Sequence, residues 1–397
     1  MNIAVAQSGG PTSVINSSLL GVFLEAYKSD KIDRIYGSFN GIEGIIKNNL
    51  IDLTDVLADG EKAALLKQTP ATVLGSCRYK LPDFSKDAEV YATITENLKK
   101  NGVGAFFYIG GNDSMDTVAK LSKYMADNNI DIKVIGVPKT IDNDLLITDH
   151  TPGFGSAAKF LTTTLSEIVR DSAVYDLKAV TIIEIMGRHA GWLAASSCLL
   201  HLNGEAPHLI YLPESEFSAD KFVEDVKAEL DKNNSVIVAV SEGVEVGERE
   251  ASATDGFGHT ALSGVGKALE NLLKDRVGCK VRSIELNVLQ RCSAHISSKT
   301  DVDEAVMIGS AAVKAMLLGE TGKMMCFNRV SNAPYKVEVT SADASLVANG
   351  EKKFPSEWIN DDGNNVKDDA IGYFLPLIEG EIEIVTENGM PKHLILK

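Results

Sequence analysis

Short apolar segments alternate along this chain with segments of helical periodicity, and the alternation limits the folds that it can adopt. Residues 2–6, 104–109 and 132–137 are apolar runs of the length typical of buried strands. Residues 14–27 and 87–101 have the periodicity of helices. Strands that alternate with helices pair in parallel through helical crossovers, so the sequence predicts an α/β fold with mainly parallel sheets.

Length and composition restrict the class of protein. The 397 residues are enough for two or three domains with a sizeable core. A formal net charge of −16 argues against nucleic acid and against anionic membranes as partners. The five cysteines are scattered and form no C-x-x-C, which fits a reducing compartment. Because there is no apparent signal peptide and no apolar stretch of membrane-spanning length, we expect a cytoplasmic protein.

The most informative segment is Pro-Lys-Thr-Ile-Asp-Asn-Asp, residues 138–144, which follows the predicted strand 132–137. Asp142 and Asp144 lie two residues apart, with Lys139 just upstream. Open α/β sheets bind their ligands at the carboxyl ends of strands. The segment is therefore predicted to supply a general base and metal ligands.

A second polar segment follows the predicted strand 104–109, and its sequence is Gly-Gly-Asn-Asp-Ser, residues 110–114. Two glycines before a helix suit a phosphate held by backbone N–H groups. Together the two segments are the equipment of a phosphoryl transferase, in which positioning and charge do most of the catalysis. Residues 7–13 also form a Gly-Gly turn, for which a plain βα turn and phosphate binding remain equally open.

Further polar or glycine-containing loops follow other predicted strands. An arginine at a strand end can bind a phosphate, although a lone arginine is more often a solvated charge. Residues 72–78 are predicted to be a strand that runs into a small-residue loop carrying Arg78. The other loops are Met186-Gly187-Arg188, Ser241-Glu242-Gly243 and the Gly-rich loop 255–259 before a predicted helix 262–273. Arg282 and Arg291 bound a predicted strand at 280–289.

Five of these motifs occur in a characteristic order: residues 110–114, 138–144, 186–188, 241–243 and 289–291. Their order and spacing resemble the phosphofructokinase family, in particular its pyrophosphate-dependent branch, over residues 2–314. The resemblance implies two doubly wound, mainly parallel-sheet α/β domains with the active site in the cleft between them. It also implies transfer of a phosphoryl group to the C1 hydroxyl of fructose 6-phosphate.

The resemblance assigns a role to each motif. Asp142 matches the general base, and Thr140 belongs to the same substrate-contacting motif. The remaining matches are Met186, Gly187 and Arg188 at the sugar and the transferring phosphate, Glu242 at a sugar hydroxyl, Arg282 and Arg291 at the sugar phosphate, and Gly10 and Arg78 at the donor phosphate.

Two positions indicate the phosphoryl donor. ATP-using members of the family typically have glycine where this chain has Asp113 and glycine where it has Lys139. A carboxylate near the path of the α-phosphate of ATP would repel it by about 4 kcal/mol at about 4 Å and an effective dielectric constant of about 20. Asp113 therefore disfavours ATP, and Lys139 would stabilise the leaving phosphate of pyrophosphate.

The sequence departs from the family at three places. Asn112 replaces the usual magnesium-binding aspartate, so Mg²⁺ is expected to depend on Asn112, Asp144 and pyrophosphate oxygens. Val288 replaces a histidine or tyrosine of the sugar-phosphate pocket. Ala179 lies near the position from which the family sends an arginine across a subunit interface.

We expect a phosphoryl-donor domain at residues 1–150, a sugar-phosphate domain at 151–320 and a C-terminal extension at 321–397 that packs back on the core. The expected partners are fructose 6-phosphate and pyrophosphate, with assembly as a homodimer or homotetramer. Three alternatives remain open: an ATP-dependent enzyme of the same fold, a non-catalytic regulatory subunit, and a lipid or NAD kinase, which the 138–144 segment disfavours.

Overall fold

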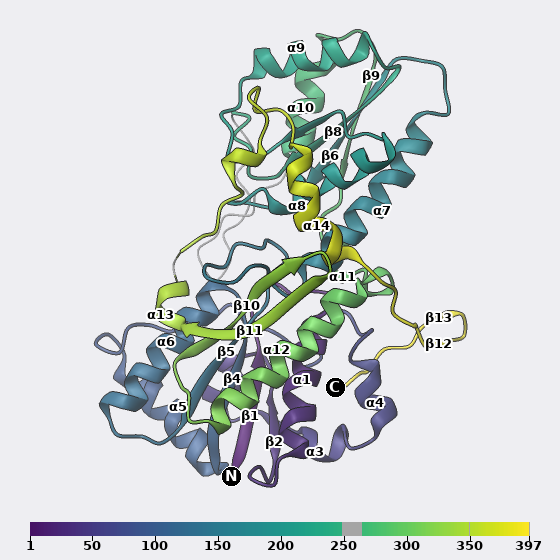
Figure 1. Cartoon of the computed structure of the whole chain (residues 1–397). Helices are drawn as coiled ribbons and strands as arrows, with labels where there is room; N and C mark the ends of the chain where they lie inside the picture. The colour runs from purple at the N-terminus through teal and green to yellow at the C-terminus, as the bar shows by residue number, and fades with distance from the viewer. Residues whose placement is uncertain (248–263, 349, 397) are drawn as a thin grey trace.

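The computed structural model describes residues 1–247, 264–348 and 350–396, in two sheets with helices packed around each (Figure 1). The predicted Gly-rich loop 255–259 and the first residues of the predicted helix 262–273 lie outside the described residues. No helix within the described part of the chain is long and apolar enough to cross a membrane.

The first sheet has seven strands in the order β11-β10-β5-β4-β1-β2-β3. Its central strands are almost fully buried because helices cover both faces. The strands are β1 (Asn2–Gln7), β2 (Ile35–Ser38), β3 (Leu50–Asp52), β4 (Val103–Gly110), β5 (Lys133–Pro138), β10 (Lys323–Asn332) and β11 (Tyr335–Asp343). All pairs are parallel except β2 with β3 and β10 with β11.

The helices of this part are α1 (Ile15–Lys28), α2 (Ile42–Ile46), α3 (Leu53–Val56), α4 (Gly60–Leu65), α5 (Ala88–Lys100), α6 (Asn112–Asp127) and α12 (Lys299–Leu317). Helices α1 and α12 pack closely because glycines lie at their contact. A Cβ atom at Gly21 would lie 2.1 Å from the Val306 carbonyl oxygen, and one at Gly309 would lie 2.2 Å from that of Ser18.

The second sheet is fully parallel, with the order β7-β8-β6-β9. Its strands are β6 (Ala179–Ile185), β7 (Leu209–Tyr211), β8 (Ser235–Ser241) and β9 (Lys280–Glu285). The helical segments with it are α7 (Phe154–Ser172), α8 (Trp192–Ala195), η1 (Ser196–Asn203), α9 (Ala219–Leu230), α10 (Val265–Lys274), α11 (Leu289–Cys292) and η2 (Ala294–Ile296). The predicted α/β fold with mainly parallel sheets is confirmed.

After β11 the chain packs α13 against α6 beside the first sheet, runs to the second sheet, and ends again beside the first part of the chain (yellow-green to yellow in Figure 1). Its segments are α13 (Ala344–Val347), η3 (Ser356–Trp358), η4 (Asp368–Ala370), α14 (Ile371–Phe374), η5 (Leu375–Ile378) and the hairpin β12 (Thr386–Glu387) with β13 (Met390–Pro391). Phe354 and Phe374 are fully buried in the same apolar core as Trp192 and Leu161. The middle of the tail is therefore part of the hydrophobic core beside the second sheet, whereas Val347 and Leu394 are buried in the cores of the first.

Two strand predictions need correction. Residues 72–77 form a loop and not a strand. The backbone N–H of Val73 donates a hydrogen bond to the side chain of Asn16, and that of Leu74 donates one to the side chain of Gln7, in place of a neighbouring strand. The predicted strand 280–289 ends at Glu285, and residues 289–292 are the short helix α11.

The sheets also do not follow the predicted boundary at residue 320. Helix α12 was predicted within the 151–320 domain, but it packs against α1 beside the first sheet. Strands β10 and β11, from the predicted extension, continue the first sheet beyond β5. Strand β5 pairs with β4 on one side only, so its other side is free to pair in parallel with β10.

Candidate active site

A cavity of about 680 Å³ lies between the ends of the two sheets. The first sheet contributes the loops that follow β1, β4 and β5, and the second sheet contributes the loops that follow β6 and β8. The predicted site residues that line it are Gly10, Arg78, Asn112, Asp113, Lys139, Thr140, Asp142, Asp144, Met186, Arg188, Glu242 and Arg291. Strand ends in a parallel sheet meet along one edge, which explains why residues so far apart in sequence converge here.

The turn after β5 holds two carboxylates. The backbone N–H of Asp142 donates to Thr140 Oγ1 at 3.1 Å, and the Thr140 hydroxyl donates to Asp142 Oδ2 at 3.4 Å. Burial raises the pKa of Asp142 and outweighs the nearby charges of Lys139 and Arg188. Burial and the negative charge of Asp142 raise the pKa of Asp144 to about 7. Carboxylates with raised pKa values make stronger bases near neutral pH than solvated ones.

Lys139 joins the two donor-side loops. Its side chain is buried, and its Nζ donates a 2.5 Å hydrogen bond to the carbonyl oxygen of Gly10. Burial lowers the pKa of Lys139 to about 8, although the charge of Asp142 opposes this shift. An ammonium group in this position can interact with both a donor phosphate and the base.

Helix α6 begins at the cavity. Gly111 is its N-cap, and Asp113 lies in its first turn, where an acidic residue interacts favourably with the helix dipole. The Asp113 carboxylate lies 3.8 Å from Nζ of Lys80, a cavity residue that our sequence reasoning missed. Its only sequence signal was its place two residues after Arg78.

Three arginines form the basic side of the cavity: Arg78, Arg188 and Arg291. Burial and the positive charges of Arg291 and Arg188 lower the pKa of Arg78. Arg291 also lies against the first loop, since a Cβ atom at Gly10 would come within 2.9 Å of its NH1. Guanidinium groups bind phosphate oxygens in a bidentate fork, so this cluster suits a phosphorylated substrate.

Arg282 lies outside the cavity formed by its own chain. It occupies the middle of β9, where its Nε donates to Thr181 Oγ1 at 3.0 Å. Its NH2 donates to Ser172 Oγ at 2.8 Å and pairs with Asp171 at 3.3 Å. The two arginines that the sequence placed at one phosphate are thus separated by the end of β9 and the start of α11.

Glu242 follows β8 at the second sheet's side of the cavity. Its Oε1 accepts the backbone N–H of Gly187 at 3.4 Å, so Gly187 lies directly behind the cavity wall. Burial, with the negative charge of Asp142, raises the pKa of Glu242 to about 7. A carboxylate or carboxyl group here can bind a sugar hydroxyl.

Asn112 and Asp144 offer oxygen atoms suited to a magnesium ion. Asn112 Oδ1 is buried and accepts no hydrogen bond from the described residues. Among those residues, no group of three or more His, Cys, Asp or Glu side chains is arranged to hold a metal. Mg²⁺ is commonly bound by one or two protein oxygens together with substrate phosphates and water, so this sparse donor set fits it.

The C-terminal tail also lines the cavity, through Gly350, Glu351 and Lys353. The ammonium group of Lys353 donates to the carbonyl oxygen of His189 and pairs with Glu351 at 3.1 Å. These residues could not be predicted from the sequence, because they lie far beyond the recognised motifs and carry no glycine-rich or strand-end signal.

Comparison with known proteins defines the class of this protein. Residues 2–316 match the family described as Phosphofructokinase, and the chain belongs to that family. Within it, the chain is 39% identical over 98% of its length to the pyrophosphate–fructose 6-phosphate 1-phosphotransferase of Halomonas elongata, covering 95% of that protein. It is 40% identical over its whole length to the enzyme of that name from Xanthomonas campestris pv. campestris, covering 96% of it.

A solved structure gives the same result. The pyrophosphate-dependent phosphofructokinase from Nitrosospira multiformis superposes with a TM-score of 0.88 at 38% identity, covering 99% of this chain and 95% of that one. The resemblance inferred from the five motifs is confirmed.

Proposed function

We propose that this protein transfers a phosphoryl group from pyrophosphate to the C1 hydroxyl of fructose 6-phosphate, giving fructose 1,6-bisphosphate and phosphate. The supporting observation is one cavity that holds the half-buried carboxylate of Asp142 beside the cations Lys139, Arg188 and Arg291. The names of the relatives at 38–40% identity support the same reaction.

The chemistry follows from the positions of these groups. The C1 oxygen attacks the terminal phosphorus, its proton passes to Asp142, and the bridging P–O bond of pyrophosphate breaks to release phosphate. Lys139 stabilises the negative charge that develops on the leaving phosphate. Asp113 lies beside Lys80 in the cavity, and we assign to its carboxylate the repulsion of the α-phosphate of ATP.

We propose Mg²⁺ as the cofactor, held by Asn112 Oδ1 and the Asp144 carboxylate together with pyrophosphate oxygens. Its contribution would be to neutralise charge on the transferring group. The two protein oxygens come from different strand ends, which fixes the donor loop relative to the base.

On the acceptor side, we assign Met186, Arg188 and Glu242 to the sugar, and Arg291 to its phosphate. With these assignments, residues 1–150 carry the loops that bind the donor, and residues 151–320 carry the loops that bind the sugar. Arg282 lies on the surface beside Asp171, so it reaches a phosphate only if a second copy of the chain brings one there. We therefore include a homodimer or homotetramer in the proposal, acting in the cytoplasm in glycolysis.

A coupled assay tests the donor and acceptor together. Fructose 1,6-bisphosphate formation from fructose 6-phosphate is measured with pyrophosphate and then with ATP, at matched free Mg²⁺. The proposal expects turnover with pyrophosphate and little with ATP. A preference for ATP would assign the ATP-dependent reaction instead, and no turnover with either donor would favour a non-catalytic subunit.

A further inference from the structure

The turn that carries the base is held by residues from far beyond the region that matches the family model, which ends at residue 316. Its central residue, Asn143, lies between Asp142 and Asp144, is fully buried and has a left-handed backbone with φ of 54°. Asparagine tolerates this conformation better than most residues, but it is not the preferred one, so contacts with the surrounding structure help to hold it. The contacts of Asn143 therefore affect the direction of its two neighbours.

Tyr373, in α14, makes one of these contacts. The Asn143 side-chain amide donates to the Tyr373 hydroxyl oxygen at 2.9 Å, and that hydroxyl donates to the Asp149 carbonyl oxygen at 2.6 Å. The tyrosine ring is fixed by the Arg329 guanidinium, 4.3 Å above its centre, and by Trp192 at 5.2 Å. The hydroxyl thus connects the two ends of the segment 143–149.

Lys352 makes the second contact, from the tail segment that follows β11. Its backbone N–H donates to the Asp144 carbonyl oxygen at 2.7 Å. Its Nζ donates to the Asp149 carbonyl oxygen at 2.6 Å and to Asn143 Oδ1 at 3.4 Å. Neither Lys352 nor Tyr373 lines the cavity, so both act through the turn and not on a substrate.

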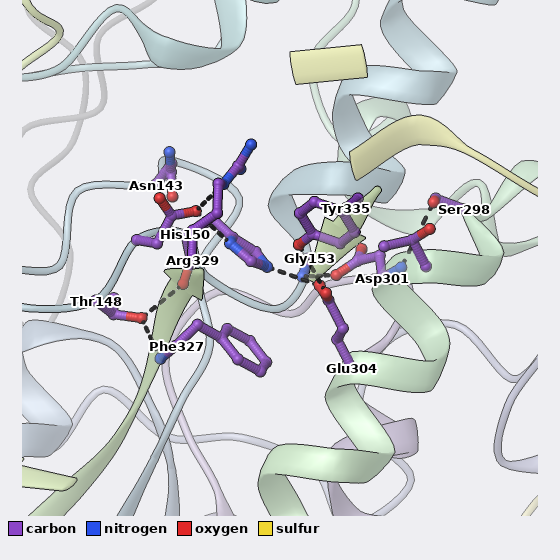
Figure 2. A network of polar contacts seen from close by, with 12 residues as sticks. Asn143, Thr148, His150, Gly153, Ser298, Asp301, Glu304, Phe327, Arg329 and Tyr335 are labelled. Atoms are coloured by element: carbon purple, nitrogen blue, oxygen red, sulfur yellow. Dashed lines mark hydrogen bonds and ion pairs between the residues drawn. The ribbon is translucent and has the colours of Figure 1, made fainter. Parts of the chain in front are cut away.

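A buried ionic network fixes the other side of the same segment (Figure 2). His150 bonds the Asp149 carboxylate through Nδ1 at 2.8 Å and the Glu304 carboxylate of α12 through Nε2 at 2.7 Å. Burial opposes the charged imidazole, but the two carboxylates outweigh it and raise the pKa of His150. Tyr335 donates to Glu304 at 2.7 Å, and within the described part of the chain its hydroxyl makes no hydrogen bond to residues 142–144.

We propose that Tyr373 and Lys352 are positioning residues for the phosphoryl transfer: they hold Asn143 so that the Asp142 carboxylate points at the acceptor hydroxyl. The inference rests on the proposed function, which assigns the base to Asp142. It gives the C-terminal tail a part in catalysis that no motif in the tail signals.

The test uses the full-length protein and fructose 6-phosphate with pyrophosphate, after the wild type has shown turnover with this pair. Tyr373→Phe removes the hydroxyl and keeps the ring. Tyr335→Phe is the matched control, because it deletes an equivalent buried hydroxyl from the same network without a bond to the turn. We expect Tyr373→Phe to lower kcat by about tenfold or more, since small misplacements of catalytic groups have effects of that size, with KM for both substrates nearly unchanged. Tyr335→Phe should keep kcat near the wild-type value.

A second pair of measurements separates positioning from general destabilisation. In an Asp142→Ser background, adding Tyr373→Phe should leave the residual kcat unchanged, because no base remains to be aimed. Lys352→Met removes the ammonium group, which lies 4.9 Å from the centre of the Trp192 ring, and keeps most of the side-chain volume. It should lower kcat in the same way, and it replaces Tyr373→Phe as the test if that variant does not fold. The proposal is overturned if both tyrosine variants lower kcat equally, if kcat survives in Tyr373→Phe, or if the loss persists without Asp142. A wild type inactive with this pair contradicts the proposed function itself.

Discussion

The pKa of Lys139 leads to a prediction that can be worked out from the structure. The side chain is buried and donates to Gly10, and burial lowers its pKa to about 8. The active form is the ammonium ion, so activity is present below about pH 8 and is lost as the pH rises through that value. The charged fraction is about 0.9 at pH 7 and about 0.1 at pH 9, which predicts about a tenfold fall in kcat/KM between these pH values.

Replacing the residue removes both the charge and this pH dependence. Lys139→Met keeps most of the side-chain volume, but it deletes a unit charge that would lie about 4 Å from an oxygen of bound pyrophosphate. At an effective dielectric constant of about 20 this interaction is worth about 4 kcal/mol, or nearly three decades in rate. We expect kcat/KM to fall by two to three decades, about 10²–10³, at pH 7.

The assay is a pH profile of kcat/KM for pyrophosphate, recorded from pH 6 to 10 for the wild type and Lys139→Met. Ionisation of pyrophosphate affects both proteins equally, so the ratio of the two profiles reports the enzyme group. The kcat profile should fall at higher pH than kcat/KM, because bound phosphates favour the ammonium form. An alkaline limb near pH 8 that remains unchanged in Lys139→Met would refute the reasoning.

Four further outcomes are expected. Asp142→Ser should lower kcat by about 10²–10⁴ while KM for fructose 6-phosphate is kept, and a variant with more than about a tenth of wild-type kcat would contradict its role as the base. Asp113→Gly should allow measurable ATP use and lower the rate with pyrophosphate, and unchanged donor selectivity in parallel assays would leave this carboxylate as a helix-start residue only. Arg291→Gln should raise KM for fructose 6-phosphate more than KM for pyrophosphate. Arg282→Gln should do the same only if the protein is an oligomer, so KM is to be compared with the oligomeric state determined by sedimentation.

The sequence alone determined much of the fold and the chemical content of the site. The strands β1, β4, β5, β6 and β8 were predictable because buried parallel strands are short, apolar and bounded by polar loops. Within each sheet the parallel strands end at one edge, so their terminal motifs gather there. The packing of the two sheets then brings both sets together, and 12 of the predicted residues line one cavity. The motif order then fixed the family, which the match over residues 2–316 confirms.

The tertiary structure decided what depends on contacts distant in sequence. Residues 72–77 had the composition of a strand, but side chains from β1 and α1 accept their N–H groups, so they form a loop. Arg282 and Arg291 were predicted to act together, yet the end of β9 separates them. The lowered pKa of Lys139 results from burial, and the hydrogen bond between Asn143 and Tyr373 results from packing between distant segments. Neither can be predicted from the local periodicity of the sequence.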